Sequence, residues 1–322
     1  MSSVRTVLIL ETEHPADLRL YADAIARAAP GVEVLGADSM SAALSQAARA
    51  SVLVAKAHSV SAELLRAMPH LEWIQALTTG VDHLLGLPVP AHVRICSARG
   101  VHGPQMSELA ILLMLALGRD FPRMLENRRQ GRWERWPQPL LMDKTLLIVG
   151  LGTIGEMLAQ RSRALGMRVI GCSNGRSQVP GFERVAPRAQ LAELAAQADF
   201  VTVLTPYDAA THRLIDARVL AAMKPTAYLI NLARGPVVDE AALIQTLRER
   251  RIAGAALDVF EREPPDLSNP LWTLPNVIMT PHIGGLSNRY AQDLVPLLVA
   301  NLRAFLAGNG SGLTNLVARP AP

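Results

Sequence analysis

The sequence Leu146-Leu147-Ile148-Val149-Gly150-Leu151-Gly152-Thr153-Ile154-Gly155 lies near the middle of the chain and decides its fold. Apolar residues run into a Gly-x-Gly-x-x-Gly pattern and an amphipathic segment follows, an order that predicts a strand, a tight turn and a helix. Gly150 permits the turn, Gly152 lets a pyrophosphate approach the backbone, and Gly155 allows close helix packing. The first helical turn includes Thr153 and Ile154, and its free N–H groups favour the binding of an anion. The stretch therefore predicts a dinucleotide site, with a ligand-free glycine-rich turn as the alternative.

Length and composition favour a well-buried globular protein of two domains. The chain has 322 residues, of which 50% are hydrophobic and 19% charged, and its formal net charge is +4. The basic residues are scattered, which argues against a nucleic-acid partner, and the longest apolar run, residues 109–117, is too short to span a membrane. Cys96 and Cys172 show no metal or redox spacing, and no signal peptide is visible. We therefore expect a cytoplasmic protein without a metal site.

Apolar runs alternate with helical segments along both halves of the chain. Four runs predict a small parallel α/β sheet in the first hundred residues: 4–10, 32–35, 52–54 and 72–77. Six later runs predict a doubly wound sheet of the dinucleotide-binding type: 145–149, 168–172, 199–204, 226–232, 252–258 and 276–280. Residues 107–117 are apolar nearly all round, which predicts a buried helix, either a domain connector or part of a subunit interface.

The residues after the second strand of this fold indicate the cofactor. An acidic residue about 20 positions after the glycines ordinarily binds the ribose 2′-hydroxyl of NAD(H). Ser173 stands in that place, followed by Asn174 and Arg176. Hydroxyl, amide and guanidinium groups can donate hydrogen bonds to a 2′-phosphate, which a carboxylate would repel. We therefore predict a preference for NADP(H), with NAD(H) as the alternative if Arg176 is only a solvated loop residue.

Polar residues follow three of the later strands, at the edge where open α/β sheets bind ligands. The three segments are Asn231-Leu232-Ala233-Arg234-Gly235, Asp258-Val259-Phe260-Glu261-Arg262-Glu263-Pro264 and Thr280-Pro281-His282-Ile283-Gly284-Gly285. An arginine can hold a carboxylate and polarise a carbonyl, and a histidine can exchange a proton near neutral pH. A carboxylate bonded to that histidine stabilises its charged form. These residue types indicate hydride transfer at a carbon that bears oxygen.

Taken in order, the glycine motif and these three segments resemble the NAD(P)-dependent D-2-hydroxyacid dehydrogenases. The likeness covers nearly the whole chain and includes residues 78–82 and 106–108. It implies two doubly wound parallel-sheet domains, one flavodoxin-like and one Rossmann-type, with a cleft between them. Residues 1–100 and 286–322 would form the substrate-binding domain, and residues 101–285 the dinucleotide-binding domain. It also implies a homodimer built through the region after Gly100.

The resemblance implies roles for individual residues in the dinucleotide-binding half. Arg234 would bind the carboxylate and carbonyl of the substrate, His282 would be the general acid/base, and Glu263 would pair with His282. Asp258 would hold the nicotinamide amide, unless it merely ends a strand. The other residues expected at the cofactor are Thr205, Pro206, Ala233 and Gly284, and His282 would contact both the cofactor and the substrate.

Three further expectations concern the substrate. The backbone around Thr79 and Gly80 would hold the substrate carboxylate. Lys56 follows the strand at 52–54, where family members often place a substrate-contacting cation, although a solvated lysine is the alternative. Trp133 and Trp136 resemble a tryptophan loop of the glyoxylate/hydroxypyruvate-reducing members, with structural packing as the alternative.

These observations predict a 2-ketoacid reductase, or D-2-hydroxyacid dehydrogenase, that uses NADP(H) and a small 2-keto or 2-hydroxy acid. A dinucleotide-sensing regulator on the same fold is the alternative from another class. Such a regulator would not require Arg234, Glu263 and His282 together. The first domain shows no arginine cluster suited to a phosphate, which disfavours 3-phosphoglycerate as the substrate.

Overall fold

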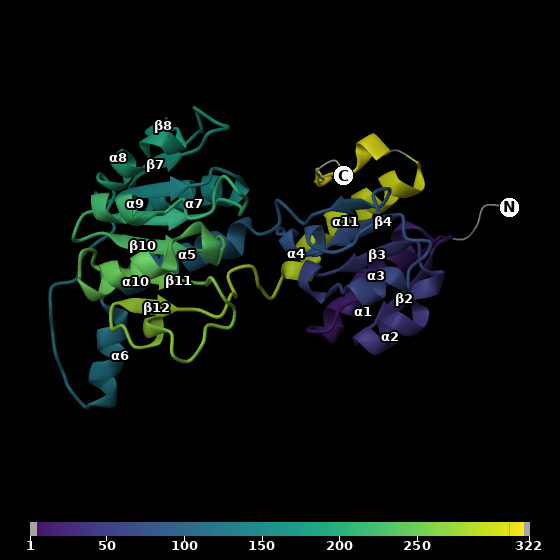
Figure 1. The fold of residues 1–322 in the computed structure, drawn as a ribbon, viewed down its shortest axis with the longest axis horizontal. Coiled ribbons are helices and arrows are strands. Elements are labelled where there is room, and N and C mark those ends of the chain that lie inside the picture. Colours follow the sequence, from purple (N-terminus) through teal and green to yellow (C-terminus); the bar gives the residue numbers. More distant parts are fainter. Residues whose placement is uncertain (1–4, 309, 319–322) are drawn as a thin grey trace. The chain divides into compact units, whose positions relative to one another are not determined.

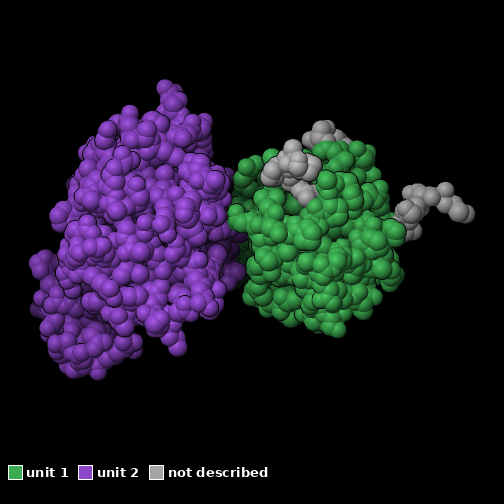
Figure 2. Space-filling model, viewed as in Figure 1, with its two compact units in different colours: residues 1–101, 287–322 green, residues 102–286 purple. Residues whose placement is uncertain are grey.

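The computed structural model describes residues 5–308 and 310–318. Residue 4 of the first expected strand and parts of the expected segment 286–322 lie outside the described residues. The chain divides into two compact units: unit 1 has the bounds Met1–Val101 and Ser287–Pro322, and unit 2 the bounds His102–Leu286 (Figure 2). Each unit is built around its own parallel sheet (Figure 1).

The sheet of unit 1 has five strands in the order β2-β1-β3-β4-β5, and all its neighbours pair in parallel. This is the flavodoxin-like order. Every residue of β1, β3 and β4 is buried, as expected for parallel strands covered on both faces. The strands are β1 (Thr6–Leu10), β2 (Glu33–Ala37), β3 (Val52–Ala55), β4 (Trp73–Ala76) and β5 (Arg94–Cys96).

Helices cover both faces of this sheet. One core packs α1 (Pro15–Ala28) and α11 (Tyr290–Leu306) against the sheet, and the other packs α2 (Met40–Gln46) and α3 (Ala62–Arg66). Alternate residues of β1 enter the two cores, because successive side chains of a strand point to opposite faces. The last long helix of the chain, α11, therefore covers one face of the N-terminal sheet. A short helix, α4 (Asp82–Leu85), follows the loop after β4.

The sheet of unit 2 has seven parallel strands in the order β12-β11-β10-β9-β6-β7-β8. The order reverses between β6 and β9, as in the Rossmann fold. The predicted architecture of two doubly wound sheets is thus confirmed. The strands are β6 (Thr145–Val149), β7 (Arg168–Cys172), β8 (Arg184–Ala186), β9 (Phe200–Val203), β10 (Tyr228–Asn231), β11 (Gly254–Leu257) and β12 (Val277–Met279).

Helices also cover both faces of the second sheet. α5 (Gly103–Gly118) and α7 (Thr153–Ala164) pack into one core. α8 (Leu191–Ala195), α9 (Ala217–Ala222) and α10 (Glu240–Arg248) pack into the other. Among the described residues, no helix is long and apolar enough to cross a membrane.

The structure differs from the sequence-based expectation in two elements of unit 2. β8 has only three residues and pairs with β7 alone, so it is too short to show a periodic pattern. α6 (Phe121–Arg129) is mostly polar, and Asn127 is its one buried residue, so its apolar side chains do not enter the core of the unit. Figure 1 shows α6 and the segment that follows it at the periphery of unit 2. Single turns of 3₁₀-helix lie at Ala47–Arg49, Ala57–Ser59, Arg188–Gln190, Gly235–Val237, Pro270–Trp272 and Gly310–Gly312.

Candidate active site

The glycine loop after β6 forms a cradle that only glycine can build. Gly150 has φ +101°, and a Cβ atom there would lie 2.6 Å from the backbone nitrogen of Thr205. A Cβ on Gly155 would lie 2.7 Å from the carbonyl oxygen of Gly150. At Gly152, by contrast, the space is open, and α7 begins at Thr153 with no side chain capping its first N–H groups. The loop therefore fits a dinucleotide phosphate at the start of α7.

Thr205 and Pro206 follow β9 on the other side of this cradle. Thr205 is buried against Gly150, and its hydroxyl accepts a hydrogen bond from Arg188 at 3.4 Å. The carbonyl oxygen of Pro206 accepts a hydrogen bond of 2.8 Å from the Thr211 hydroxyl. This loop closes the glycine turn from the side of β9.

The loop after β7 holds the residues predicted to choose the cofactor. The Ser173 hydroxyl accepts a hydrogen bond from the Gly175 amide at 3.2 Å. The side-chain oxygen of Asn174 accepts one of 2.8 Å from the Arg188 backbone amide. Arg176 turns back to the glycine loop, where it donates to the Leu151 carbonyl at 3.0 Å and pairs with Glu156. The charge of Arg176 is thus partly balanced within the protein.

Arg188 is a basic residue of this loop region that the sequence analysis missed. It lies in the 3₁₀ turn after β8, the strand that was not predicted. Burial raises the pKa of the Cys172 thiol to about 11, and the nearby Arg188 charge acts in the opposite direction. The Arg188 guanidinium thus lies close to the ends of both β7 and β9.

The segment after β10 is braced by Asn231. The side-chain amide of Asn231 donates to the Arg234 carbonyl at 3.0 Å, and its oxygen accepts from the Ala233 amide at 3.1 Å. Arg234 donates to the Ala233 carbonyl at 2.7 Å. A Cβ on Gly235 would lie 1.9 Å from the Phe260 backbone, so glycine is required there. The brace sets the direction in which Arg234 leaves the strand.

His282 and Glu263 form a hydrogen-bonded pair after β12 and β11. The distance from His282 Nδ1 to Glu263 Oε2 is 2.6 Å, and the other Glu263 oxygen accepts from the Phe260 amide at 3.0 Å. Burial acts to raise the pKa of Glu263, but the hydrogen bonds from His282 and Phe260 and the charges of His282 and Arg234 together lower it. Glu263 is therefore ionised at neutral pH. Because it holds Nδ1, the Nε2 atom of His282 is left to exchange a proton.

Asp258 supports the loop that carries His282. Its carboxylate is buried and accepts three hydrogen bonds, from the Thr280 hydroxyl at 2.6 Å, the Ile283 amide at 3.0 Å and the Gly284 amide at 2.8 Å. A Cβ on Gly284 would lie 2.8 Å from this carboxylate. Asp258 therefore fixes residues 280–284, an arrangement that the sequence analysis did not foresee.

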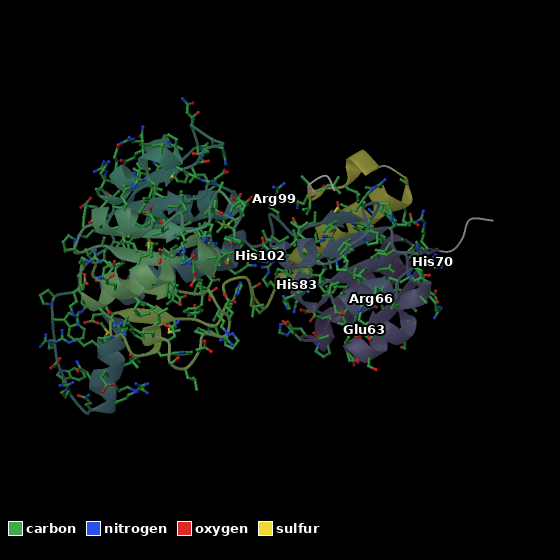
Figure 3. All side chains as sticks on the ribbon, viewed as in Figure 1. Glu63, Arg66, His70, His83, Arg99 and His102 are labelled. Carbon is green, nitrogen blue, oxygen red and sulfur yellow. The ribbon has the colours of Figure 1, made fainter. Side chains whose placement is uncertain are left out.

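Among the described residues the remaining histidines form no metal-binding group, and one of them, His58, is paired with Glu13 at 2.8 Å. Of those labelled in Figure 3, His70 is exposed, and His83 Nε2 lies 2.9 Å from the Val60 carbonyl oxygen. His212 lies 3.4 Å from the Tyr207 hydroxyl. Within residues 5–308 and 310–318, no group of three His, Cys, Asp or Glu side chains could hold a metal ion.

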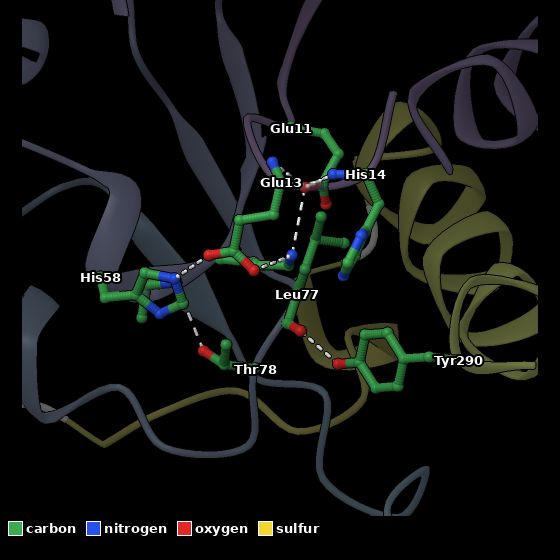
Figure 4. A network of polar contacts seen from close by, with 9 residues as sticks. Glu11, Glu13, His14, His58, Leu77, Thr78 and Tyr290 are labelled. Atoms are coloured by element: carbon green, nitrogen blue, oxygen red, sulfur yellow. Dashed lines mark hydrogen bonds and ion pairs between the residues drawn. The ribbon is translucent and has the colours of Figure 1, made fainter. Parts of the chain in front are cut away.

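In unit 1, the loop after β4 and the loop after β3 lie together. The Thr78 hydroxyl donates to the Gly80 carbonyl at 2.7 Å, and the Thr79 hydroxyl donates to the Ala98 carbonyl at 3.4 Å. Lys56 is neither solvated nor available as a lone cation: it is buried and forms ion pairs with Glu11 and Glu13 (Figure 4).

Known proteins are similar to this chain in both sequence and fold. Residues 111–284, more than half of the chain, match the family described as D-isomer specific 2-hydroxyacid dehydrogenase, NAD binding domain. The glyoxylate reductase of Thermococcus litoralis is 35% identical over 260 residues, which are 77% of this chain and 78% of that protein. The chain belongs to the D-2-hydroxyacid dehydrogenase family.

Solved structures of this dehydrogenase family match nearly the whole chain. A family member from Aeromonas salmonicida is 33% identical, with a TM-score of 0.90 over 98% of this chain and 99% of the other. An NADPH-dependent glyoxylate/hydroxypyruvate reductase from Sinorhizobium meliloti, solved with NADP and sulfate, is 26% identical, with a TM-score of 0.83 over 97% and 98%. The protein is therefore an NAD(P)-dependent oxidoreductase acting on a small 2-hydroxy or 2-oxo acid.

The two tryptophans of interest in this dehydrogenase have different surroundings. Trp136 lies under the Arg123 guanidinium, which is 4.4 Å from its ring centre. Arg123 and Asn127 of α6 both donate to Glu134, so α6 and the tryptophan segment hold each other in place. Trp133 is 93% exposed. Packing within the chain thus explains Trp136 and leaves Trp133 unexplained.

We expect Asp258→Ala to destabilise the dehydrogenase strongly. The change removes the acceptor of three hydrogen bonds, among them that of the buried Gly284 amide, so the free energy of unfolding should fall by about 3 kcal/mol. Urea denaturation measures this. Asp266→Ala is the matched control, because the Asp266 carboxylate is exposed and its partner among the described residues is the exposed Arg262. Equal losses in the two variants would contradict the supporting role of Asp258.

Proposed function

We propose that this dehydrogenase reduces small 2-oxo acids of the glyoxylate and hydroxypyruvate kind, with NADP(H) as its preferred cofactor. The observation that carries the proposal is the His282–Glu263 pair, together with Arg234, whose charge acts on Glu263. The arrangement supplies a proton donor, a group that orients it, and a cation for the substrate carboxylate. The relatives named above support the substrate class.

In the proposed mechanism, each residue of the site has one task. Arg234 binds the substrate carboxylate and draws charge onto the carbonyl oxygen. His282 gives its Nε2 proton to that oxygen, while Glu263 stabilises the imidazolium through Nδ1. Reduced nicotinamide, when bound, supplies the hydride to the carbonyl carbon. Asp258 keeps the His282 loop in place, and that it also holds the nicotinamide amide stays a prediction.

The loop at residues 78–80 is our proposed binding site for the substrate carboxylate in unit 1. It follows β4 at the carboxyl edge of the sheet, where such folds bind ligands. The backbone around Thr79 and Gly80 would hold the carboxylate there, and the Thr78 hydroxyl shapes the turn through its hydrogen bond to the Gly80 carbonyl.

A substrate panel tests the proposal. The oxidation of NADPH and of NADH is followed with glyoxylate, hydroxypyruvate, pyruvate and phenylpyruvate, and the binding of each cofactor is measured separately. We expect turnover, with glyoxylate or hydroxypyruvate as the best substrate. Tight cofactor binding with no turnover of any 2-oxo acid would favour a dinucleotide-sensing regulator, which none of the relatives named above supports.

We further propose that Arg188, together with Ser173 and Asn174, holds the 2′-phosphate of NADP(H). Arg188 is bound to Asn174 and Thr205 and has no carboxylate partner among its described contacts, whereas Arg176 pairs with Glu156. No acidic side chain stands at Ser173 to repel a phosphate. The Sinorhizobium meliloti reductase, which was solved with NADP, supports the same preference.

Arg188→Ala should therefore raise the KM for NADPH by at least about tenfold and leave the KM for NADH nearly unchanged, because a charge-assisted hydrogen bond to phosphate is lost. Arg176→Ala is the comparison, and we expect a smaller effect. Steady-state kinetics with both cofactors measures the two changes. Equal changes for NADPH and NADH would show that Arg188 does not contact the 2′-phosphate.

We also propose a homodimer formed through α5, α6 and the segment after them. α5 was expected to be buried nearly all round, yet it has an exposed leucine, and the exposed apolar side chains continue beyond it. They are Leu112, Phe121, Leu125, Trp133, Leu140 and Met142. Apolar exposure of this extent is typical of an interaction surface. The molecular mass in solution tests the proposal.

A cytoplasmic location remains our expectation, and both cysteines are free thiols, as a reducing compartment favours.

A further inference from the structure

The carboxyl edge of the unit 1 sheet carries an ion-pair network at the point where strand order reverses. Glu11 directly follows β1, and Lys56 directly follows β3. In the order β2-β1-β3-β4-β5 the chain changes direction between these two strands. Open α/β sheets bind ligands outside the carboxyl ends of their strands at such a switch point. Glu11 and Lys56 therefore occupy the ligand-binding position of this sheet.

The positive charge of Lys56 is balanced within the network. Its ammonium lies 3.1 Å from Glu11 Oε1 and 2.8 Å from Glu13 Oε2, and its side chain is 7% exposed (Figure 4). A buried ammonium requires such partners, because isolated burial of a charge is costly. Glu13 and His58, which lie 2.8 Å apart, are the members that solvent reaches. A ligand at this edge therefore meets a carboxylate and an imidazole before it meets the ammonium.

The network contains two carboxylates, one ammonium and one imidazole. The hydrogen bond from Lys56 is the main cause that lowers the pKa of Glu13 to about 2, against the opposing effect of burial, so Glu13 is ionised at neutral pH. The hydrogen bond and charge of His58 also act to lower the pKa of Glu13. Burial and the charge of Glu11 raise the pKa of the neighbouring Asp17. Two glutamates thus share one lysine, and a third carboxyl group responds to their field.

Glu11 also has an unused hydrogen-bond acceptor. Its Oε1 atom accepts from Lys56 and from the amides of Glu13 and His14, whereas its buried Oε2 atom has no hydrogen-bond partner among the described residues. The side chain is almost fully buried. Part of the carboxylate charge at the switch point is therefore not compensated by a donor.

This network adjoins the loop that we propose for the substrate carboxylate. The Ala57 amide, next to Lys56, lies within hydrogen-bonding distance of the Thr78 hydroxyl at 3.4 Å, and that hydroxyl donates to the Gly80 carbonyl. Tyr290 donates to the carbonyl of Leu77, which precedes this loop (Figure 4). A 2-oxo acid held at residues 78–80 would therefore have its side chain close to the segment 56–58, which carries Lys56 and His58.

We propose that this network selects 2-oxo acids with an uncharged or cationic side chain and discriminates against those with a second carboxylate or a phosphate. The inference rests on the proposed 2-oxo acid reduction and names the substrate class of that same site. A second anion would lie near ionised Glu13, and the Lys56 ammonium that could attract it is buried and already paired with Glu11 and Glu13. Repulsion between two like charges in contact at a partly exposed position should lower kcat/KM by roughly tenfold.

Three 2-oxo acids with the same five-carbon chain test the inference: 2-oxopentanoate, 2-oxoglutarate and 5-guanidino-2-oxopentanoate. At low ionic strength with saturating NADPH, kcat/KM should be at least about tenfold lower for 2-oxoglutarate than for 2-oxopentanoate. The kcat/KM for the guanidino compound should equal or exceed that for 2-oxopentanoate. Raised salt should reduce the discrimination, because it screens the partly exposed Glu13.

Two variants locate the effect. Glu13→Gln should raise kcat/KM for 2-oxoglutarate about fivefold relative to 2-oxopentanoate, because one charge is removed from the network. Glu72→Gln is the matched control: Glu72 is 47% exposed against 42% for Glu13, and it precedes β4 at the opposite edge of the sheet, paired with Arg5. In this control we expect the ratio of kcat/KM for 2-oxoglutarate to kcat/KM for 2-oxopentanoate to stay as in the unaltered enzyme.

The outcomes are distinct. Equal kcat/KM for 2-oxoglutarate and 2-oxopentanoate in the unaltered enzyme would overturn the inference and leave the proposed reduction intact. Discrimination that persists in Glu13→Gln, or that Glu72→Gln relieves equally, would overturn the role of the network. No reduction of any of the three acids, or of glyoxylate, would overturn the proposed function and this inference with it.

Discussion

His282→Ala should lower kcat for 2-oxo acid reduction by about 10²- to 10⁴-fold, the contribution of a positioned general acid. The imidazole is held by Glu263 through Nδ1 at 2.6 Å, so its loss removes the proton donor and leaves Glu263 unpaired. Binding of NADPH should change little, because the glycine cradle after β6 is a separate part of unit 2. Steady-state kinetics and cofactor titration measure the two effects.

His70→Ala is the control for this variant, since His70 is an exposed histidine of unit 1 (Figure 3). It should retain full activity. The kcat of Glu263→Gln should lie between those of His282→Ala and His70→Ala, because the amide can still hold Nδ1 but does not stabilise the imidazolium. A folded His282→Ala protein with most of its kcat intact would show that another group protonates the substrate.

The second large effect concerns Arg234. Arg234→Ala should lower kcat/KM by about 10²- to 10³-fold, because truncation of one partner of a charged, hydrogen-bonded pair costs several kcal/mol. Arg234→Lys should recover only part of this loss, since an ammonium cannot form the two parallel hydrogen bonds that a guanidinium gives a carboxylate.

The control for Arg234 is Arg213→Ala, which removes an exposed arginine held only by long ion pairs to Asp239 and Glu261. Its kcat/KM should stay near that of the unaltered enzyme. If Arg234→Ala raised KM no more than Arg213→Ala and kept kcat, the substrate carboxylate would have to bind elsewhere.

Local patterns were sufficient to predict most of the fold. The strand, the glycine turn and the helix from residue 145 onward are encoded by neighbours in sequence, and β6 and α7 occur there. The structure adds two elements that the sequence did not predict: β8, because three residues at a sheet edge show no period, and α6, because most of its residues are polar. β8 is held by its pairing with β7, and α6 is held by α5 and by hydrogen bonds to Glu134.

Site residues divide in the same way. The pairing of His282 with Glu263 was expected from a resemblance, and the structure places these two side chains in contact. By contrast, the partners of Lys56 lie 45 and 43 residues away in sequence, so no local pattern could reveal them. Asp258 is similar: the 280–284 loop that it supports begins 22 residues later. Spacing identifies which residue types follow a strand, but only the folded chain shows what each one contacts.

The most direct test of the central claim is the fate of the transferred hydride. Reduced NADP deuterated at the nicotinamide C4 position is mixed with the enzyme and hydroxypyruvate or glyoxylate in a single turnover, and the product is analysed by mass spectrometry. We predict one deuterium at C2 of the hydroxy acid, formed rapidly by the unaltered enzyme and far more slowly by His282→Ala. Bound cofactor with no deuterated product from either acid would contradict the claim.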